Sequence, residues 1–412
     1  MKKQTTASSK PKKKANAPRS ARKRLLHFLC KWSIITLNTI VKVALLLPIP
    51  VFLLWYSFSI DRNGWFQGDQ YEREVALAML DGNAISNFEK MDERQITKLY
   101  AQNLSEPLDV ISLGSSRVLQ LTEDIVGTDS FFNAGMVGAE QPDVMSSYYL
   151  FDRAEKIPKT VIFCVDPWIF STAPEATTYR RVDWTMYNEF LHYGLGQQDV
   201  DVTSSEENMA LWLSLTSPAF FQENLHYYIE NKETGMRPSV VTGDLHTQLT
   251  DIKMPDGSIL YQMNLRNITS EDAYHLALTA INNSFVNCEG FYEMDDGLKH
   301  LFSEFIQYMQ SKGSTVVLML TPYHPVVYEK VLEQPEHYSG FFQVESWLRD
   351  YAQENKLALY GSYDPLAAGC TEEDFYDGWH VKGSGIAKFF PGISGVQPYS
   401  SLSKTVTLHR LP

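Results

Sequence analysis

A nearly continuous apolar stretch over residues 32–60 constrains this chain more than any other feature of its sequence. Its last part, residues 43–60, contains 18 residues without a charge, which is the lower limit for a helix that crosses a bilayer. Lys42 can extend toward one membrane interface, and Trp55 and Tyr56 are typical of the other. We therefore predict a transmembrane anchor over residues 32–60.

Charge is distributed very unevenly on the two sides of this stretch. The first 42 residues hold 12 of the 36 basic residues and no acid, whereas the remainder carries 24 basic residues against all 49 acids, a net charge of −25. Basic residues are retained on the cytoplasmic side of a membrane helix. Residues 1–31 are therefore predicted to be a cytoplasmic tail, disordered over residues 1–24, and everything after residue 60 is expected outside the cytoplasm of a single-pass cell-membrane protein.

Three other interpretations of the N-terminal region fit the sequence less well. A cleaved signal peptide would need a cleavage site of the Ala-x-Ala type, and Trp-Tyr-Ser-Phe-Ser-Ile-Asp follows the apolar run instead. A nucleic-acid-binding arm is compatible with the basic tail, but the acidic body would repel phosphate, so we expect no nucleic-acid partner. A buried core helix would not need a dozen cations before it.

From about residue 108 onward, short apolar runs alternate with segments of helical spacing. The runs that resemble parallel strands buried on both faces cover residues 108–113, 130–132, 160–165, 315–320 and 357–360. Helices are expected after residue 141, over residues 297–312, and around residues 344–351. This alternation predicts an α/β fold with a mostly parallel sheet that is covered on both faces.

These patterns divide the chain beyond the anchor into three parts. Residues 61–104 form a membrane-proximal segment, with helical spacing over residues 70–103. Residues 105–395 form the main α/β domain, which an insertion over residues 171–290 interrupts with turns and aromatic residues but no strand–helix rhythm. Residues 396–412 form a C-terminal tail.

The cysteines and histidines give no sign of a metal site. Cys164, Cys288 and Cys370 lie beyond the anchor at wide spacings and form no CxxC motif, so their pairing stays open. Cys164 belongs to an apolar run and is expected to be a buried small hydrophobe. We considered Asp166, His324 and His380 as a metal site, but their spacing is not that of a ligand set. The sequence therefore predicts neither a metal nor another cofactor.

Polar residues at the carboxyl ends of the predicted strands are the candidates for chemistry. Gly114-Ser115-Ser116 follows the first strand and makes a tight turn that can expose a hydroxyl. Near the C-terminus, Asp377 and His380 are one helical turn apart, so they can act as orienter and base. Each motif alone occurs often by chance, and Ser115 or Ser116 could be only a turn residue. Their order, with strands and helices between them, is a stronger signal and predicts that a serine of this turn forms a relay with His380 and Asp377.

Other strand ends supply candidates for contact with a substrate. They are Ser115, Arg117, Asp166, Trp168 and His324. Each has a structural alternative. Arg117 can bind an anionic group or pair with a local acid. Asp166 can cap the segment that follows it, and a histidine in the position of His324 is more often structural than functional.

With these blocks in this order, the chain resembles the SGNH (GDSL-like) hydrolases. The likeness covers residues 105–170 and 295–390 and is greatest to the membrane-anchored branch that includes the teichoic-acid D-alanyl transfer protein and alginate O-acetylation proteins. It implies a three-layer, flavodoxin-like sheet and Ser116 as the nucleophile. It also implies an oxyanion hole made by the backbone N–H groups of Ser116 and Gly135.

One block departs from the family pattern. The family usually carries Gly-x-Asn after the third strand, and the Asn side chain donates to the oxyanion, whereas this chain has Asp166-Pro167-Trp168. An ionised Asp166 would repel an oxyanion. Because the D-alanyl transfer branch also lacks this Asn, the departure is compatible with the resemblance but weakens the expectation of simple esterase activity.

The resemblance implies a serine O-acyltransferase or esterase that acts on an envelope glycan or glycopolymer. We favour transfer because a free hydrolase needs no anchor, whereas a transferase must lie where its acyl carrier emerges. A multi-span membrane protein that delivers acyl groups is the expected partner, beside the lipid around the single helix. The acidic body disfavours a strongly anionic acceptor unless Arg117, Arg180 and Arg181 form a basic patch. The alternative is a non-catalytic envelope component that has kept the fold.

Overall fold

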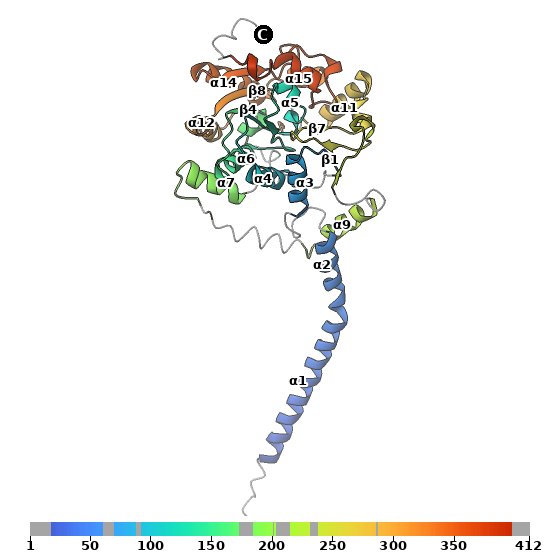
Figure 1. Ribbon diagram of the computed structural model, residues 1–412. Helices are drawn as coiled ribbons and strands as arrows, with labels where there is room; N and C mark the ends of the chain where they lie inside the picture. Colours follow the sequence, from blue (N-terminus) through green and yellow to red (C-terminus); the bar gives the residue numbers. More distant parts are fainter. Residues whose placement is uncertain are drawn as a thin grey trace, which may run out of the picture.

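The N-terminal region is a long helical rod in the computed structural model, which describes residues 18–60, 70–87, 92–172, 184–200, 202, 215–230, 238–285 and 287–397 (Figure 1). The rod consists of α1 (Pro18–Leu46) and α2 (Pro48–Ile60). Hydrogen bonds bridge the junction of the two helices at Pro48. Leu47 N–H donates to Val43 O over 2.7 Å, and Val51 N–H donates to Leu47 O over 3.2 Å. Among the described helices, one segment of 30 residues, Lys31–Ile60, is long and apolar enough to cross a membrane.

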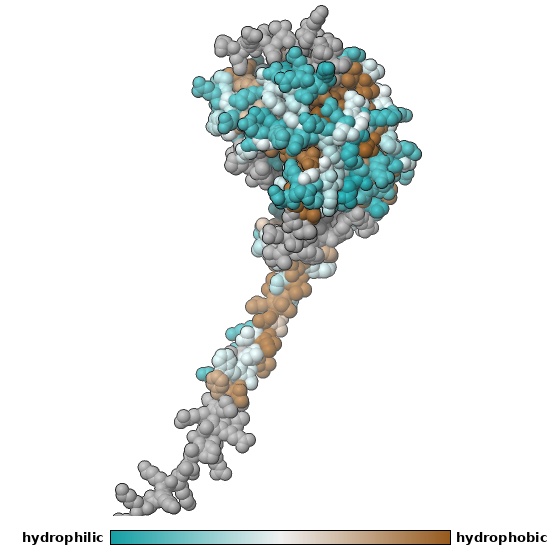
Figure 2. All heavy atoms as spheres, turned by 90° about the vertical axis from the view of Figure 1, so that its left-hand side faces the viewer, coloured by the Kyte–Doolittle hydropathy of each residue, from teal (hydrophilic) through white to brown (hydrophobic). Residues whose placement is uncertain are grey.

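The surface of the rod differs from that of the α/β body. Figure 2 shows apolar side chains along the rod and a mainly hydrophilic surface on the face of the body that it presents.

The prediction of disorder over residues 1–24 is wrong for its last part, because the helix begins at Pro18. Extending an existing helix adds one hydrogen bond per residue without a new nucleus, so the apolar helix can propagate into the basic segment. Residues 1–17 lie outside the described residues.

The five predicted strands form one parallel sheet (Figure 1). They are β2 (Val110–Leu113), β3 (Phe131–Asn133), β4 (Thr160–Cys164), β8 (Thr315–Leu320) and β9 (Ala358–Gly361). The order across the sheet is β3-β2-β4-β8-β9, and every neighbouring pair is parallel. The predicted α/β class and parallel sheet are therefore confirmed. The chain goes from β2 to β3 on one side and then to β4 on the other side of β2. The direction of winding therefore reverses between β2 and β4, and doubly wound sheets bind ligands at such a point.

Apolar residues of the strands are buried on both faces of the sheet. On one face, Ile111, Phe163 and Leu318 belong to a cluster that includes residues of α6 (Gln141–Arg153), α12 (Asp296–Ser311) and α14 (Ser339–Glu354). On the other face, Ile162 and Val317 pack with residues of α5 (Glu123–Val126) and α15 (Gly383–Phe389). This explains why the strands read as continuous apolar runs.

The predicted helical segment over residues 70–103 is two helices. It divides into α3 (Gln70–Leu80), the short strand β1 (Ile85–Ser86) and α4 (Glu93–Asn103). A turn at Gly82, which has a φ of 80°, ends the first helix, and Asp92 caps the second by accepting from the backbone N–H of Arg94. Val75 of α3 and Ile96 of α4 belong to the main core, so this segment packs onto the α/β body.

The insertion contributes helices and a second, antiparallel sheet. Its larger helices are α7 (Trp184–Glu189), α9 (Pro218–Glu230) and α11 (Ser270–Asn283). Its strands are β5 (Ser239–Val240), β6 (Ile252–Lys253) and β7 (Ile259–Leu260), and they join β1 in the order β5-β1-β6-β7. The insertion is thus bonded to the membrane-proximal segment.

A tight hairpin turn between β6 and β7 seats the insertion on the edge of the parallel sheet. Asn133 N–H at the end of β3 donates to Asp256 O over 2.7 Å, and Ile259 N–H donates to Leu119 O over 3.0 Å. Gly257 has a φ of 81°, and a Cβ at this position would lie 2.3 Å from the backbone oxygen of Asn133. The backbone of the turn therefore approaches the strand more closely than any other residue type permits.

Replacing Gly257 with alanine should detach this turn and destabilise the chain. The left-handed φ costs about 1–2 kcal/mol for a residue with a Cβ, and the overlap with Asn133 adds roughly 1–3 kcal/mol. Gly369→Ala is the matched control, because Gly369 has a φ of 72° but nothing within 4 Å of the added Cβ. Thermal unfolding should show a clearly larger loss for Gly257→Ala, and equal losses would contradict the close seating.

The cysteines beyond the anchor form no disulfide among the described residues. Cys164, Cys288 and Cys370 are all buried and free. Burial raises the pKa of the Cys164 thiol to about 12, so it is not a thiolate at neutral pH. The expectation that Cys164 is a buried small hydrophobe is confirmed.

Candidate active site

The turn after β2 is built around a glycine and carries Ser116. Gly114 has a φ of 145°, and a Cβ there would lie 2.7 Å from Cys164 O of the neighbouring strand β4. The chain then enters the 3-10 helix η1 (Ser116–Val118), which Ser115 caps by accepting from Arg117 N–H over 3.2 Å. Ser115 is thereby used inside the turn, and Ser116 is the serine left with a hydroxyl for other contacts.

The structure brings Ser116, His380 and Asp377 together, although the serine and the histidine are 264 positions apart. Ser116 Oγ lies 2.9 Å from His380 Nε2, and His380 Nδ1 lies 2.8 Å from Asp377 Oδ2. All three side chains are neither fully buried nor fully exposed. The distances are those of a nucleophile hydrogen-bonded to a base that a carboxylate orients.

Asp377 is fixed by its own backbone neighbours. Its Oδ1 accepts from the backbone N–H groups of Trp379 (2.8 Å) and His380 (2.9 Å), which leaves Oδ2 for the imidazole. Burial favours the protonated form, but His380 and these N–H donors favour the carboxylate more, so the pKa of Asp377 lies below its ordinary value. An anionic Asp377 requires a hydrogen on His380 Nδ1, and Nε2 can then accept from the Ser116 hydroxyl.

The two predicted oxyanion donors differ in their present partners. Within the described residues, no acceptor is assigned to Ser116 N–H, whereas Gly135 N–H donates to Asn133 Oδ1 over 3.0 Å. Gly135 also packs tightly, because a Cβ there would lie 2.4 Å from Val118 Cγ1. An oxyanion would therefore have to share the Gly135 N–H with Asn133, and the role of Gly135 stays a prediction.

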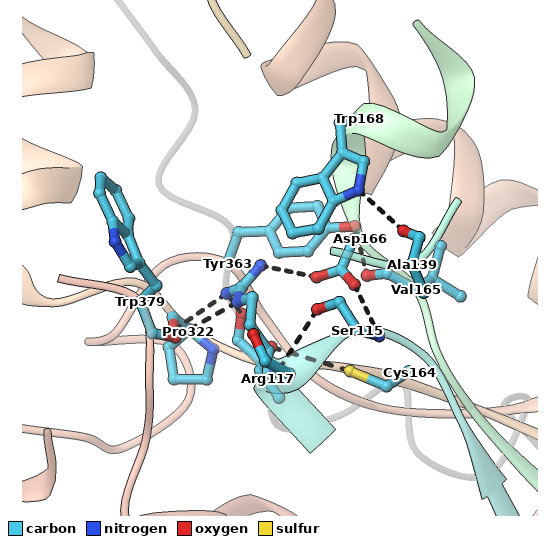
Figure 3. Close-up of polar contacts among 12 residues, drawn as sticks. Ser115, Arg117, Ala139, Cys164, Val165, Asp166, Trp168, Pro322, Tyr363 and Trp379 are labelled. Atoms are coloured by element: carbon cyan, nitrogen blue, oxygen red, sulfur yellow. Dashed lines mark hydrogen bonds and ion pairs between the residues drawn. The ribbon is translucent and has the colours of Figure 1, made fainter. Parts of the chain in front are cut away.

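Arg117 and Asp166, two of the candidates for substrate contact, are buried and paired with each other. Arg117 is 2% exposed and Asp166 1%, and Arg117 Nη1 lies 3.1 Å from Asp166 Oδ1 (Figure 3). Of the readings considered for Arg117, pairing with a local acid is the one observed. Burial raises the pKa of Asp166, and the nearby Arg117 opposes this rise. In the interior the two opposite charges compensate each other.

The other three predicted contact residues are buried as well. Ser115 is 1% exposed, and Trp168, which donates from Nε1 to Ala139 O over 3.0 Å, is 6% exposed. His324 is completely buried, and its Nδ1 accepts from Val326 N–H over 3.2 Å at the start of α13 (Pro325–Leu332). Polar side chains at these strand ends bond to one another and to backbone because the loops that carry them pack together.

His324 should make the chain sensitive to acid. Burial lowers the pKa of His324 from 6.5 to about 4. Between these values the unfolded chain binds a proton that the folded chain does not, so the contribution of neutral His324 is complete above pH 6.5 and falls as the pH drops toward 4. Asn can replace the capping acceptor but does not titrate. The melting temperature of His324→Asn should therefore fall less between pH 6.5 and 4 than that of the unaltered chain, and parallel pH curves would contradict this.

The insertion places an aromatic residue beside the relay that the sequence did not reveal. The ring of Tyr261, directly after β7, lies 6.1 Å from the His380 ring and 5.1 Å from that of Tyr376. Burial raises the pKa of Tyr261, so its phenol is neutral. Gln120 connects these parts, since its Nε2 donates to Ile259 O over 2.6 Å and its Oε1 accepts from Tyr376 over 3.3 Å. The hairpin thus forms one wall beside His380.

No group of three or more His, Cys, Asp or Glu side chains could hold a metal ion in the part of the chain that the structure describes. Comparisons with protein-family models and with curated proteins returned no match. A functional assignment therefore depends on the geometry of the site and the order of the sequence blocks.

Proposed function

We propose that this chain is a membrane-anchored serine acyltransferase that modifies an envelope glycan or glycopolymer. The observation that carries the proposal is the pair of hydrogen bonds from Ser116 Oγ to His380 Nε2 (2.9 Å) and from His380 Nδ1 to Asp377 Oδ2 (2.8 Å). The strand order and the two buried faces of the sheet support the three-layer SGNH-like arrangement that the sequence blocks imply.

In the first half of the proposed reaction, Ser116 Oγ attacks the carbonyl carbon of an acyl donor. His380 Nε2 takes the serine proton, and the carbonyl oxygen becomes an oxyanion near Ser116 N–H. The intermediate collapses as the donor's leaving group departs with the proton from His380, which leaves an acyl ester on Ser116. Asp377 stabilises the imidazolium that exists between these two proton transfers.

In the second half, an acceptor hydroxyl gives its proton to His380 and attacks the acyl carbon. The bond to Ser116 breaks, and His380 returns the proton to Ser116 Oγ. Water can replace the acceptor, so transfer requires that the site favours a bound alcohol. The wall formed by the insertion at Tyr261 supports this, because it covers one side of His380.

The site also has an acceptor where the family carries a side-chain oxyanion donor, which is expected to slow acyl transfer and hydrolysis alike. Asp166 is an acceptor bonded to Ser115 N–H and Arg117, so it replaces the family's Asn without supplying a donor. Loss of one such donor costs about 10²–10³-fold in rate. In the proposed orientation the basic tail is cytoplasmic and the site is outside, beside a multi-span protein that delivers the acyl group.

Mass analysis of envelope glycans tests this proposal and names the substrate. Cells that carry Ser116→Ala should lose one acyl mass increment from one polymer relative to cells that carry the unaltered chain. The size of the increment identifies the acyl group, and the polymer identifies the acceptor. A gain of the increment would show a deacylase, and no change in any polymer would contradict an acyl-transfer role.

A further inference from the structure

We propose that Arg117 is a positioning residue that fixes the loop of His380 against the turn of Ser116, with Asp166 as its anchor. The inference rests on the proposed function, since it concerns how the same relay is kept in register. It assigns a role to the charged pair that stands where the family carries a neutral oxyanion donor.

The guanidinium of Arg117 connects four segments that meet at the carboxyl edge of the sheet (Figure 3). From its own position after β2, Nη1 donates to Asp166 after β4, over 3.1 Å. Nη2 donates to Thr321 O and, over 3.1 Å, to Pro322 O after β8. Nε donates to Trp379 O over 3.3 Å. Trp379 directly precedes His380, so the last bond holds the backbone that carries the base.

Asp166 extends the same connection to the nucleophile. Its Oδ1 accepts from Arg117, and its Oδ2 accepts from Ser115 N–H over 3.3 Å. A continuous path of hydrogen bonds therefore runs from the residue before Ser116, through Asp166 and Arg117, to the residue before His380. The relay distance of 2.9 Å between Ser116 Oγ and His380 Nε2 depends on the relative position of these two backbones.

The surroundings of Arg117 fit a planar guanidinium with several N–H donors and do not fit a lysine ammonium. Its Cζ lies 3.9 Å from the centre of the Tyr323 ring and 6.0 Å from that of Tyr363. Tyr363 is itself held by a bond from its hydroxyl to Val165 O over 2.9 Å. A lysine would carry the charge, but its ammonium cannot stack on the ring and reach carbonyls in three directions at once.

Arg117→Lys separates a positioning role from a purely structural one. The measured quantities are the maximal rate of covalent labelling of Ser116 by a fluorophosphonate probe, the probe concentration at half that rate, and the melting temperature. We expect the maximal rate to fall about 10–100-fold, because a displacement of about 1 Å at reacting atoms has effects of this size, while the half-saturating concentration stays the same.

Arg349→Lys is the matched control. Arg349 is another buried arginine, and its bonds to Glu345 and, over 2.9 Å, to Gly361 O at a strand end involve neither the Ser116 turn nor Trp379. The Arg349→Lys variant should lose thermal stability and keep the labelling rate of the unaltered chain. If Arg117→Lys does not fold, Asp166→Leu removes the counter-charge without introducing a new oxyanion donor and should label about 10-fold more slowly. Wild-type labelling in a folded Arg117→Lys or Asp166→Leu variant would overturn the positioning role, and an unaltered chain that is not labelled at Ser116 would overturn the proposed function with it.

A second and independent observation concerns α9, which lies beside the end of the apolar rod nearest the body (Figure 1). The Phe221 ring lies 5.2 Å from that of Tyr56 and 6.5 Å from that of Phe52, and Tyr228 lies 6.5 Å from Tyr56. Phe52 and Tyr56 belong to the segment that is long and apolar enough to span a membrane. Helix α9 is therefore at the depth of the last turns of that segment.

The exposed side of α9 is divided into an apolar and a polar strip. Leu225, Tyr228 and Ile229 are 37%, 38% and 62% exposed and follow the helical spacing of Phe221. Glu223 and His226 are also exposed and lie on the other side of Ile229 from Leu225, with the exposed Gln222 at the boundary beside Ile229. We infer that α9 lies in the membrane interface, with Leu225 and Ile229 among lipid acyl chains and the polar strip toward water.

Site-specific fluorescence of the full chain in phosphatidylcholine vesicles tests this placement. In a Cys30→Ser background, a nitrobenzoxadiazole label on Ile229→Cys should be blue-shifted and quenched by lipids with a nitroxide near the headgroup. The same label on Glu223→Cys, about 120° around the helix from Ile229, should be quenched by a water-soluble nitroxide instead. Equal exposure of both labels to water would overturn the inference, and so would a label at 229 that neither quencher reaches, since a protein contact would then cover it.

Discussion

Replacing Ser116 with alanine should reduce acyl turnover by on the order of 10⁶-fold, the size of effect that follows loss of a serine nucleophile. The substitution removes one hydroxyl whose assigned hydrogen bond is to His380, so the melting temperature should stay the same. Turnover can be followed as chromophore release from an activated aryl ester by the detergent-solubilised chain.

Ser115→Ala is the matched control for this loss. Ser115 is buried and caps η1, so its replacement should cost about 1 kcal/mol of stability and leave most of the turnover. Full turnover in Ser116→Ala, or a greater loss of turnover in Ser115→Ala than in Ser116→Ala, would contradict the assignment of Ser116 as the nucleophile.

Asp377→Asn should lower the rate about 10⁴-fold while keeping the shape of the site. The two backbone N–H groups that bond to Oδ1 fix the orientation of an asparagine, whose oxygen must take that place. Its NH₂ group then faces His380 Nδ1 and forces that nitrogen to accept. The hydrogen moves to Nε2, and the imidazole can no longer take the proton of Ser116.

Asp374→Asn provides the comparison for a carboxylate in the same loop. Asp374 bonds to Lys388 over 2.6 Å and to Thr371 N–H over 2.7 Å, and it contacts no member of the relay. Its replacement should lower the melting temperature without a comparable loss of rate. Equal rates for Asp377→Asn and the unaltered chain would show that His380 does not depend on Asp377.

The strands and the relay were predictable because their signals are local. A strand buried on both faces is a continuous apolar run, and residues 315–320 were predicted with the same bounds as β8. Ser116 belongs to a glycine turn at a strand end and Asp377 and His380 are three positions apart, so their order along the chain, with the resemblance to the SGNH blocks, predicts the candidate site.

The second sheet and the wall beside His380 had no such signal. Its strands are two residues long, too short for any periodicity, and β1 pairs with β5 across 153 positions through Ser86 and Ser239. Tyr261 reaches the site only because the turn at Gly257 fits against Asn133. These contacts are set by tertiary packing and leave no pattern within a sequence window.

Arg117 and Asp166 show where residue type and position along the chain do not decide between two roles. Their places at strand ends are compatible with substrate contact, and equally with pairing to a local acid or capping. The deciding fact is that the two side chains, 49 positions apart, neutralise each other in the interior. Charged residues at the carboxyl edge of a sheet can organise the loops as readily as they bind a ligand.

Covalent labelling of the full chain with a fluorophosphonate probe, followed by peptide mass analysis, tests the Ser116–His380–Asp377 relay most directly. The probe forms a bond only with a serine whose hydroxyl a neighbouring base activates. One adduct is expected, on Ser116. Its rate of formation should fall in Asp377→Asn, and no adduct should form in Ser116→Ala. A folded chain that takes up no probe across the pH range in which it is stable, or takes it up on another serine, would contradict the relay and favour a non-catalytic envelope component.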